Sequence, residues 1–184
     1  MIITNFLNSL FLKRLMKICI SGTPGTGKTT VSKALGMDYI NLNEFARNNN
    51  CIDGYDEERK SEIVDIECLK EKLKDFDNVI FESHYSHLMN CDIIIILRTS
   101  PKILKERLKE RNYDNNKIME NLEAEAISLI TQESLMENKN VYEIDTGKYN
   151  LEETVKIIKK ILNGNGDNFK AGYIDYSEEI LEWY

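Results

Sequence analysis

Residues 22–30 constrain this chain more than any other stretch. They read GTPGTGKTT and fit the pattern G-x-x-x-x-G-K-[ST]. The apolar, partly β-branched residues 17–20 before them predict a buried strand, and residues 29–35 after them predict a helix. Strand, glycine-rich loop and helix form the context in which this motif binds phosphate. The sequence therefore predicts a nucleoside triphosphate site.

The residue types explain how such a loop binds phosphate. Glycine lets successive backbone N–H groups point inward without a Cβ clash, and the positive end of the following helix adds to the cradle. Lys28 supplies a charge for the β- and γ-phosphates, and Thr29 supplies a hydroxyl for Mg²⁺. The motif identifies neither the acceptor nor whether the reaction is transfer or hydrolysis. The residues that we assign to ATP here are Gly25, Thr26, Gly27, Lys28, Thr29 and Thr30.

Length and charge limit the remaining possibilities. A chain of 184 residues is long enough for one domain with a sizeable core. Its net charge of −7 disfavours broad nucleic-acid binding, which needs a basic face, and we predict no direct sequence-specific binding either. No run of about 18 apolar residues occurs, so we predict no membrane-spanning helix and no membrane partner.

The four cysteines are widely separated and include no C-x-x-C pair. This spacing disfavours a zinc site and makes a reducing, intracellular compartment the default. We expect a cytoplasmic protein in which each cysteine is a small buried or half-buried apolar residue. The four are Cys19, Cys51, Cys68 and Cys91.

Residues 1–15 precede the first predicted strand. Their apolar residues come before Lys13 and Arg14, whereas a signal peptide carries its charges first and a small-residue cleavage site afterwards. Two alternatives stay open. Translation begins at Met16, directly before the strand, or the segment forms a short amphipathic helix that docks on the body.

Strand and helix signals alternate along the rest of the chain. Strands are predicted at 17–20, 38–42, 78–82, 92–97 and 141–144. Helices are predicted at 29–35, 44–47 after an Asn43 cap, 66–76, 101–111, 116–137 and 151–162. The near-continuous apolar run at 92–97 indicates burial on both faces. We therefore predict an α/β fold of the P-loop NTPase type: a five-stranded parallel sheet with helices on both faces and the site at the strands' carboxyl ends.

The connecting segments are predicted from turn and charge signals. Residues 51–60 are predicted to be a mobile loop, 62–65 a marginal strand or turn, and 83–87 a loop or short helix. Residues 163–166 are predicted to be a flexible linker. An acidic, aromatic tail follows, with a short helix from Ser177.

A carboxylate ends the predicted strand at 78–82. In a P-loop enzyme, Glu82 at this position would hold Mg²⁺ or its water. His84, two residues later, would orient an attacking water or transfer a proton. The plainer alternative is a solvated carboxylate beside a surface histidine. Given the P-loop we favour the functional alternative for this pair, and the plain one for His87.

Cationic side chains supply further candidates. Arg47 on the second predicted helix would grip an acceptor phosphate, with an ordinary exposed arginine as an equal alternative. Arg98, Arg107, Arg111 and Lys148 are candidates for the γ-phosphate. Arg107 is more simply part of a solvated helix face. Arg111 lies beside a predicted turn at which a lid would hinge, so it is the stronger candidate.

Five stretches match a known family in the same order. They are residues 20–30, 39–41 with Ala46 and Arg47, 54–58 (GYDEE), 82–84 (ESH), and 97–113 with its LRT, ERL and RNY triplets. Together they resemble the adenylate kinase isoenzyme 6 family, small P-loop kinases of archaea and eukaryotic nuclei. The resemblance covers about residues 16–162. The sequence DGYDEE and the carboxylate-x-His triplet are its more specific parts.

The resemblance implies an activity and partners. The activity is that of a nucleoside monophosphate kinase, in which Mg-ATP and AMP give two ADP, with some breadth of acceptor. A weak ATPase would act in late maturation of the small ribosomal subunit and its 16S or 18S rRNA, through transient binding of ribosomal protein uS11.

The resemblance also implies a division of the chain. The kinase domain spans 16–162, with a monophosphate-binding segment at about 41–64 and a lid at about 110–120. A linker and tail occupy 163–184. Arg47 and Asp56 would bind the monophosphate, and Arg111 and Lys148 the ATP.

Two residues depart from the family pattern. Glu82 stands where the family usually has Asp, and its longer side chain would alter the metal geometry. Asn112 stands where Gly is usual, which would stiffen the lid hinge, although Asn tolerates positive φ better than most residues. The tail falls outside the match. It suits a basic ribosomal partner, and packing against its own body is the plainer alternative.

Three functions follow from these observations. The first is an adenylate-type kinase whose catalytic residues are Lys28, Arg111, Glu82 and His84, with Thr29 and Glu82 organising Mg²⁺. The second is a nucleotide-switched assembly factor with incidental kinase activity. The third is a kinase of a small metabolite.

Overall fold

The computed structural model describes residues 16–137 and 140–183. The two alternatives for residues 1–15 therefore concern a segment outside the described residues. Within the described ranges, no helix is long and apolar enough to cross a bilayer.

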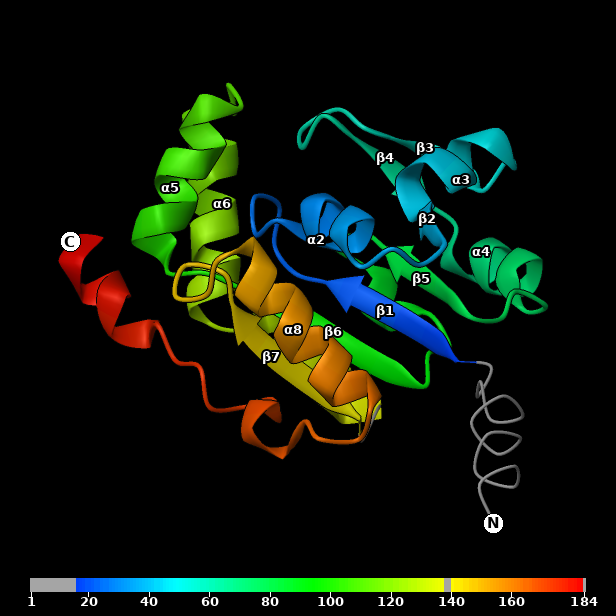
Figure 1. Cartoon of the computed structure of the whole chain (residues 1–184). Helices are drawn as coiled ribbons and strands as arrows, with labels where there is room; N and C mark the ends of the chain where they lie inside the picture. Colours follow the sequence, from blue (N-terminus) through cyan, green and yellow to red (C-terminus); the bar gives the residue numbers. More distant parts are fainter. Residues whose placement is uncertain (1–15, 138–139, 184) are drawn as a thin grey trace, which may run out of the picture.

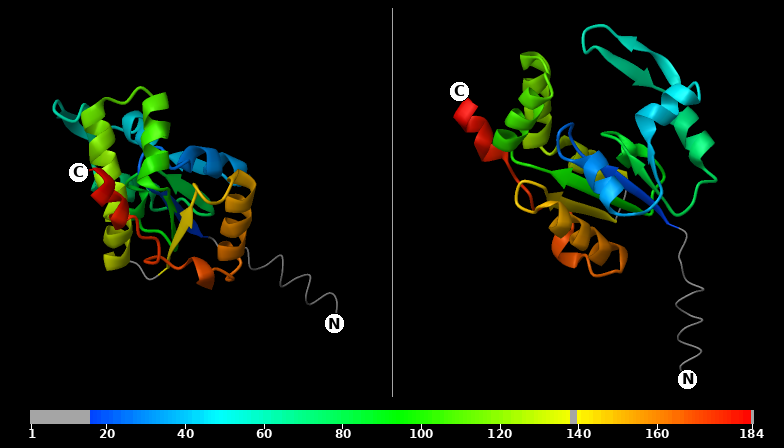
Figure 2. Two further views of the ribbon diagram at one scale, coloured as in Figure 1. Left: turned by 90° about the vertical axis from the view of Figure 1, so that its left-hand side faces the viewer. Right: turned by 45° about the horizontal axis from the view of Figure 1, so that its top comes forward.

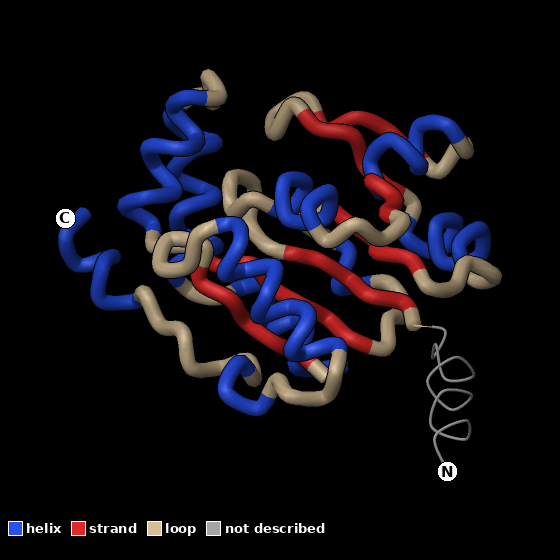
Figure 3. Tube along the Cα trace, viewed as in Figure 1, coloured by secondary structure: helices blue, strands red, loops and turns tan. Residues whose placement is uncertain are grey.

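Five parallel strands form the central sheet, as predicted, in the order β2-β5-β1-β6-β7 (Figures 1 and 3). Strand β1 lies in the middle, where Ile18 pairs with Ile80 on one side and Ile93 on the other. The chain crosses to the other side of β1 between β5 and β6, so a binding site is expected at the carboxyl ends of these strands. The strands are β1 (Lys17–Ser21), β2 (Tyr39–Asn41), β5 (Val79–Glu82), β6 (Ile93–Arg98) and β7 (Val141–Asp145).

The two faces of the sheet are buried under different helices. Helices α2 (Lys28–Ala34) and α8 (Leu151–Leu162) cover the face that carries Ile18, Ile20 and Ile95 (Figure 1). The opposite face, which carries Cys19, Ile94 and Ile96, packs against the remaining body helices. Successive residues of one strand thus enter different cores, as the pleat requires. The helices on that face are α3 (Leu42–Asn48), α4 (Ile66–Leu73) and α7 (Leu129–Glu137).

A helical pair projects beyond the carboxyl edge of the sheet. Helices α5 (Pro101–Glu110) and α6 (Asn115–Ala126) form their own small core and rise together at the upper left of Figure 1. Ser100 caps α5, and Asp114 caps α6. In the turn between them Asn112 has φ +58°, a conformation that Asn tolerates.

The prediction of one helix over 116–137 is wrong. The helix ends after Ala126, and α7 begins at Leu129. Between them Ser128 has φ +57°. The buried Arg98 guanidinium donates to the carbonyl of Glu125 (2.8 Å) and to the hydroxyl of Ser128 (3.0 Å). These contacts hold the chain at the point where the first helix ends.

The prediction of a loop over 51–60 is wrong for residues 52–56, which form a strand, and right for the turn at 57–60. Strands β3 (Ile52–Asp56) and β4 (Ser61–Val64) form an antiparallel hairpin, and the second of them is the marginal strand that the sequence indicated. Asp56 accepts from the backbone N–H of Arg59 and so organises the hairpin turn. The hairpin rises opposite the α5–α6 pair, at the upper right of Figure 1 and of the right-hand view in Figure 2.

Asn41, not Asn43, caps α3. Its side chain accepts from the backbone N–H of Glu44 at 3.0 Å. The preceding strand ends earlier than the apolar pattern suggests, so the helix includes Leu42, whose side chain is fully buried.

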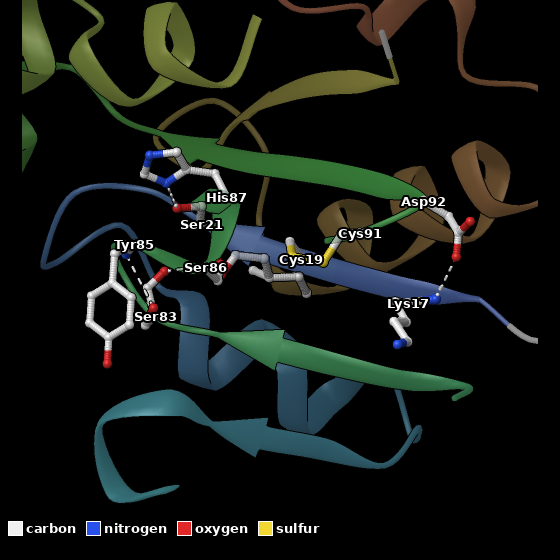
Figure 4. The surroundings of a disulfide bond; sticks show 10 residues. Lys17, Cys19, Ser21, Ser83, Tyr85, Ser86, His87, Cys91 and Asp92 are labelled. Carbon is white, nitrogen blue, oxygen red and sulfur yellow. Dashed lines mark hydrogen bonds between the residues drawn. A yellow bond between two sulfur atoms is a disulfide. The ribbon is translucent and has the colours of Figure 1, made fainter. Parts of the chain in front are cut away.

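The four cysteines are buried or half-buried, as expected, but they are paired, which removes the argument from their spacing for a reducing compartment. Two disulfides join Cys19 to Cys91 (Figure 4) and Cys51 to Cys68, with Cα–Cα distances of 5.9 and 5.6 Å. The first links β1 to the segment before β6, and the second links the base of the hairpin to α4. These pairings span 72 and 17 residues. They arise from strand and helix packing that the spacing along the chain does not reveal.

The C-terminal tail packs against its own body, which was the plainer alternative. Ala171 donates to the carbonyl of Val141 (3.0 Å), and Gly172 donates to the carboxylate of Glu143 (2.8 Å). Figure 1 shows the tail following this edge of the sheet towards α5 and α6. Its last described part is a 3-10 segment, Ser177–Trp183, where a short helix was expected.

Candidate active site

The glycine-rich loop connects β1 to α2 at the carboxyl edge of the sheet. Two glycines show why the motif requires this residue. A Cβ on Gly22, whose φ is +138°, would lie 2.3 Å from the carbonyl oxygen of Leu97. Gly27 has φ +95° directly before the helix, in a region that L side chains rarely adopt. The loop can therefore turn its backbone N–H groups towards a bound anion.

The ammonium group of Lys28 lies inside this loop. It donates to the carbonyls of Gly22 (2.7 Å) and Thr23 (3.1 Å). Burial lowers its pKa to about 8, nearby Glu82 opposes the shift, and nearby Arg111 adds to it. A buried cation whose two hydrogen-bond acceptors are neutral carbonyls gains from an anionic ligand, so the loop favours phosphate.

Glu82 lies at the end of β5, buried beside the loop. Its Oε2 accepts from the side-chain N–H of Asn41 (2.8 Å) and from the hydroxyl of Thr29 (3.2 Å). A hydroxyl and a carboxylate this close supply two hard oxygen donors of the kind that Mg²⁺ prefers. No cluster of three or more His, Cys, Asp or Glu residues that would hold a metal alone occurs in the described ranges. This donor set fits Mg²⁺ that completes its coordination with water and nucleotide phosphates.

One large cavity, of about 890 Å³, lies between the loop, the hairpin and the α5–α6 pair. A nucleotide-sized ligand fits a cavity of this size. Its walls bring together most of the residues that the sequence singled out. Those residues are Gly25, Gly27, Lys28, Thr29, Thr30, Arg47, Glu82, His84 and Arg111.

His84 is exposed and lines the cavity beside the loop. The surrounding protein displaces water from the ring and, together with the Lys28 ammonium, lowers the pKa of His84 to about 4. The ring is therefore neutral at pH 7. A neutral imidazole can accept a proton or a hydrogen bond from water in the cavity.

The far side of the cavity is formed by α3 and the hairpin. Arg47, in the last turn of α3, pairs with Glu62 of β4, and the Glu62 carboxylate raises its pKa. Asn43 lies next to it and accepts from the hydroxyl of Tyr85 at 3.0 Å. Tyr55 of the hairpin lines the same wall. This side offers a cation beside aromatic and amide groups, which suits a second, phosphate-bearing ligand.

Arg111 ends α5 at the roof of the cavity, where Tyr113 and residues of α6 also line it. The roof and the hairpin touch. Arg59 forms an ion pair with Glu120 (3.3 Å), and the Lys117 ammonium donates to the carbonyl of Arg59 (3.3 Å). The two projecting parts thus meet through these side chains above the cavity. Figure 1 shows the two parts rising on opposite sides of it.

Several sequence candidates lie elsewhere. Arg98 is 1% exposed and pairs with Glu125 and Glu143, so its assignment to the γ-phosphate is wrong.

Lys148 lies outside the cavity wall, with its ammonium 5.3 Å from the centre of the Tyr149 ring. Thr26 and Asp56 also lie outside the wall. The ATP-binding roles of Thr26 and Lys148, and the monophosphate-binding role of Asp56, stay predictions.

Arg107 has a role that the sequence did not reveal. It is half-buried, and it donates to the carbonyls of Gly25 (3.3 Å) and Thr146 (2.9 Å). The Thr146 hydroxyl in turn lies 2.9 Å from the carbonyl of Thr26. Arg107 therefore ties the phosphate-binding loop to the loop after β7. The one sequence feature that could have indicated this role is the position of Arg107 one turn before Arg111.

Glu125 was also missed. At 2% exposure it accepts from Arg98 (2.7 Å), from the backbone of Thr99 (3.2 Å) and from the hydroxyl of Thr23. It thereby joins the phosphate-binding loop to the end of α6. An acidic residue in a predicted helix gives no sign of such burial.

His87 lies outside the cavity wall, as the plain alternative implies, but it is buried rather than a surface histidine. Its ring is buried, its Nδ1 lies 3.0 Å from the hydroxyl of Ser21 (Figure 4), and its Nε2 lies 3.0 Å from the carboxylate of Glu133. The Ser21 hydroxyl also donates to the carbonyl of His84 at 3.0 Å. These contacts support the segment that carries His84.

Comparison with known proteins places the chain in a family. A family model described as an AAA domain matches residues 18–128. A relative named "Putative adenylate kinase" from Thermococcus kodakarensis is 40% identical over 179 residues, which cover 91% of this chain and 98% of the relative. A relative of the same name from Archaeoglobus fulgidus is 39% identical over 171 residues, which cover 90% and 94%.

A solved structure shows how widely the fold is shared. The shikimate kinase from Acinetobacter baumannii, in complex with shikimate, superposes with a TM-score of 0.60 over 85% of this chain and 98% of that one, at 15% identity. The α/β fold of P-loop kinases is therefore common to proteins with little sequence in common. At about 40% identity over nearly its whole length, this chain belongs to the family whose archaeal members are named "Putative adenylate kinase".

Proposed function

We propose that this protein is a nucleoside monophosphate kinase of the adenylate type, which converts Mg-ATP and AMP into two ADP. One observation carries the proposal. A single cavity has the Lys28 loop on one side and Arg47 on the other, with Arg111 at the roof. Two phosphate-binding sides that face each other suit direct transfer between two nucleotides. The names of the archaeal relatives agree with this activity.

The reaction needs positioning and charge rather than a covalent intermediate. The loop amides and Lys28 hold the β- and γ-phosphates, and Arg47 holds the AMP phosphate in line with them. An oxygen of the AMP phosphate forms a bond to the γ-phosphorus as the bond to the β,γ-bridging oxygen breaks. Arg111 lies close enough to the loop to stabilise the charge on the transferred group. Thr29 and Glu82 would hold Mg²⁺, which would supply further neutralisation of the phosphates.

The test is ADP production by the purified protein from Mg-ATP, with and without AMP. We expect AMP to accelerate ADP formation strongly, with two ADP formed per AMP consumed. Arg47→Ala should raise the KM for AMP and leave the KM for ATP nearly unchanged, because Arg47 lies on the acceptor side. Slow hydrolysis that is indifferent to AMP would rule out adenylate kinase activity. Turnover of a small metabolite without AMP activity would favour the metabolite-kinase alternative.

A second candidate function, ATP hydrolysis, is supported by His84. Its neutral ring lines the cavity near Lys28 and can accept a proton from an attacking water. We expect His84→Ala to lower AMP-independent hydrolysis about 10²-fold, the scale of general base catalysis. AMP phosphorylation should change only a few-fold, since its acceptor oxygen is already ionised. Both rates are measured on the same preparation, so the transfer rate is the internal control. Equal losses in both rates would contradict a hydrolysis-specific role.

The cellular role proposed from the resemblance is late maturation of the small ribosomal subunit. In this role the protein would act in the cytoplasm and would release ribosomal protein uS11 as it hydrolyses ATP. Support comes from the sequence resemblance and from the His84 arrangement. Pull-down of purified uS11 with and without Mg-ATP tests the partner. The same binding with His84→Ala tests whether release depends on hydrolysis.

A further inference from the structure

The Arg47–Glu62 ion pair has an unusual arrangement within the cavity wall. The Nε of Arg47 lies 2.7 and 2.9 Å from the two carboxylate oxygens of Glu62. Both residues line the cavity. Among the described residues no acceptor takes a hydrogen bond from the terminal nitrogens of Arg47, Nη1 and Nη2. The four N–H donors of these two nitrogens thus stay available, and two of them form the terminal edge of the guanidinium, away from the carboxylate.

This pair lies within one structural unit. Cys51, at the base of the hairpin, donates its backbone N–H to Ala46 of α3 (2.9 Å) and is joined to Cys68 of α4 by a disulfide. The base of the hairpin is therefore held to α3 beside Arg47, and Glu62 lies two residues before the end of β4 at that base. The Arg59–Glu120 contact differs, because it joins the hairpin to α6 and must open if those parts separate. The Arg47–Glu62 pair is preformed and does not depend on closure of the site.

We propose that Glu62 is a positioning residue for the acceptor. It holds the Nε edge of Arg47 and so directs the terminal edge of the guanidinium at the AMP phosphate. This inference rests on the proposed kinase function and adds a residue to it. A flexible arginine pays side-chain entropy to bind, and a carboxylate that fixes the guanidinium in advance reduces that cost. In the opposite role, the Glu62 carboxylate competes with the AMP phosphate for Arg47. Its removal would then raise the affinity for AMP.

The experiment compares Glu62→Ala and Glu62→Gln with the wild-type protein. We expect Glu62→Ala to weaken AMP binding, measured by calorimetry, and to raise the KM for AMP, each by about 10-fold. The KM for ATP should stay within about two-fold, since the phosphate-binding loop is untouched. Glu62→Gln should recover most of the affinity, because its amide oxygen still accepts from Nε.

Glu44→Gln is the matched control. It removes an exposed carboxylate one turn from Arg47 on the same helix that neither pairs with Arg47 nor lines the cavity, and it should have no effect.

A double-variant cycle separates positioning from general damage. In an Arg47→Ala background, Glu62→Ala should cause no further loss of AMP affinity, because the carboxylate acts only through the arginine. Additive losses would overturn the inference, as would a gain of affinity in both Glu62 variants. An unchanged KM for AMP in Glu62→Ala, beside normal AMP-dependent turnover of the wild type, would overturn this inference alone. Absence of AMP-dependent turnover in the wild type would overturn the proposed function and this inference together.

Discussion

Replacing Lys28 with methionine is expected to lower the rate of ADP formation from Mg-ATP and AMP by about 10²–10³-fold, the usual loss for one preorganised donor at a reacting group. The ammonium is the cation enclosed by the loop, held by the carbonyls of Gly22 and Thr23. Methionine has a similar length and no charge, so the loop keeps its side-chain volume and loses its attraction for phosphate. Steady-state rates at saturating AMP measure the effect.

Lys33→Met is the matched control. Lys33 lies in the same helix and is exposed, and its replacement should leave the rate unchanged. Circular dichroism of both variants should match the wild type. A loss below about 10-fold in Lys28→Met would be too small for a donor at the transferred phosphate and would contradict the assignment of the loop as the ATP site.

The pH dependence of the wild type provides a second measure of the same residue. In the free protein the pKa of Lys28 is lowered to about 8, mainly by burial. Because kcat/KM reports groups of the free enzyme, kcat/KM for ATP should fall as the pH rises through about 8, where the ammonium loses its proton. Bound phosphates favour the charged form, so kcat should decline only at higher pH. Lys28→Met should lack the decline in kcat/KM near this pH.

Local patterns were sufficient for the sheet and the phosphate-binding loop. The apolar strands and the GTPGTGKTT motif are read from neighbouring residues, and the structure has the predicted five-stranded parallel sheet. The gathering of Lys28, Glu82 and His84 was also predictable, because the carboxyl ends of adjacent parallel strands meet at one edge.

The remaining features depend on contacts between distant segments. Glu62 reaches Arg47 only because residues that looked like a polar loop pair as a hairpin. Ser128 interrupts a sequence that is otherwise helical, at a position where Arg98, 30 residues away, binds its hydroxyl. The periodicity of apolar residues along the chain does not show which distant residue will contact a given position. These positions are where tertiary contacts override local preference.

Replacing Arg98 with methionine is expected to destabilise the fold more than any surface change. Arg98 is 1% exposed, and Glu125 and Glu143, at 2% and 4%, accept from its guanidinium. Burial alone would lower the pKa of Arg98, but the two carboxylates outweigh it and raise the pKa above its ordinary value. Removal of the shared cation leaves two buried carboxylates without a counter-charge. We expect the free energy of unfolding to fall by about 3–5 kcal/mol.

Thermal unfolding measures this loss. For a protein of this size it corresponds to a fall in Tm of about 6–20 °C. Lys109→Met, which removes an exposed ion pair with Glu106, is the control and should change stability by less than about 1 kcal/mol. Adding Glu143→Gln to Arg98→Met should recover part of the stability, because it removes one of the two unpaired charges. A Tm within about 2 °C of the wild type for Arg98→Met would mean that the carboxylates find other partners. The cluster would then not be what fixes the end of α6 to β6 and β7.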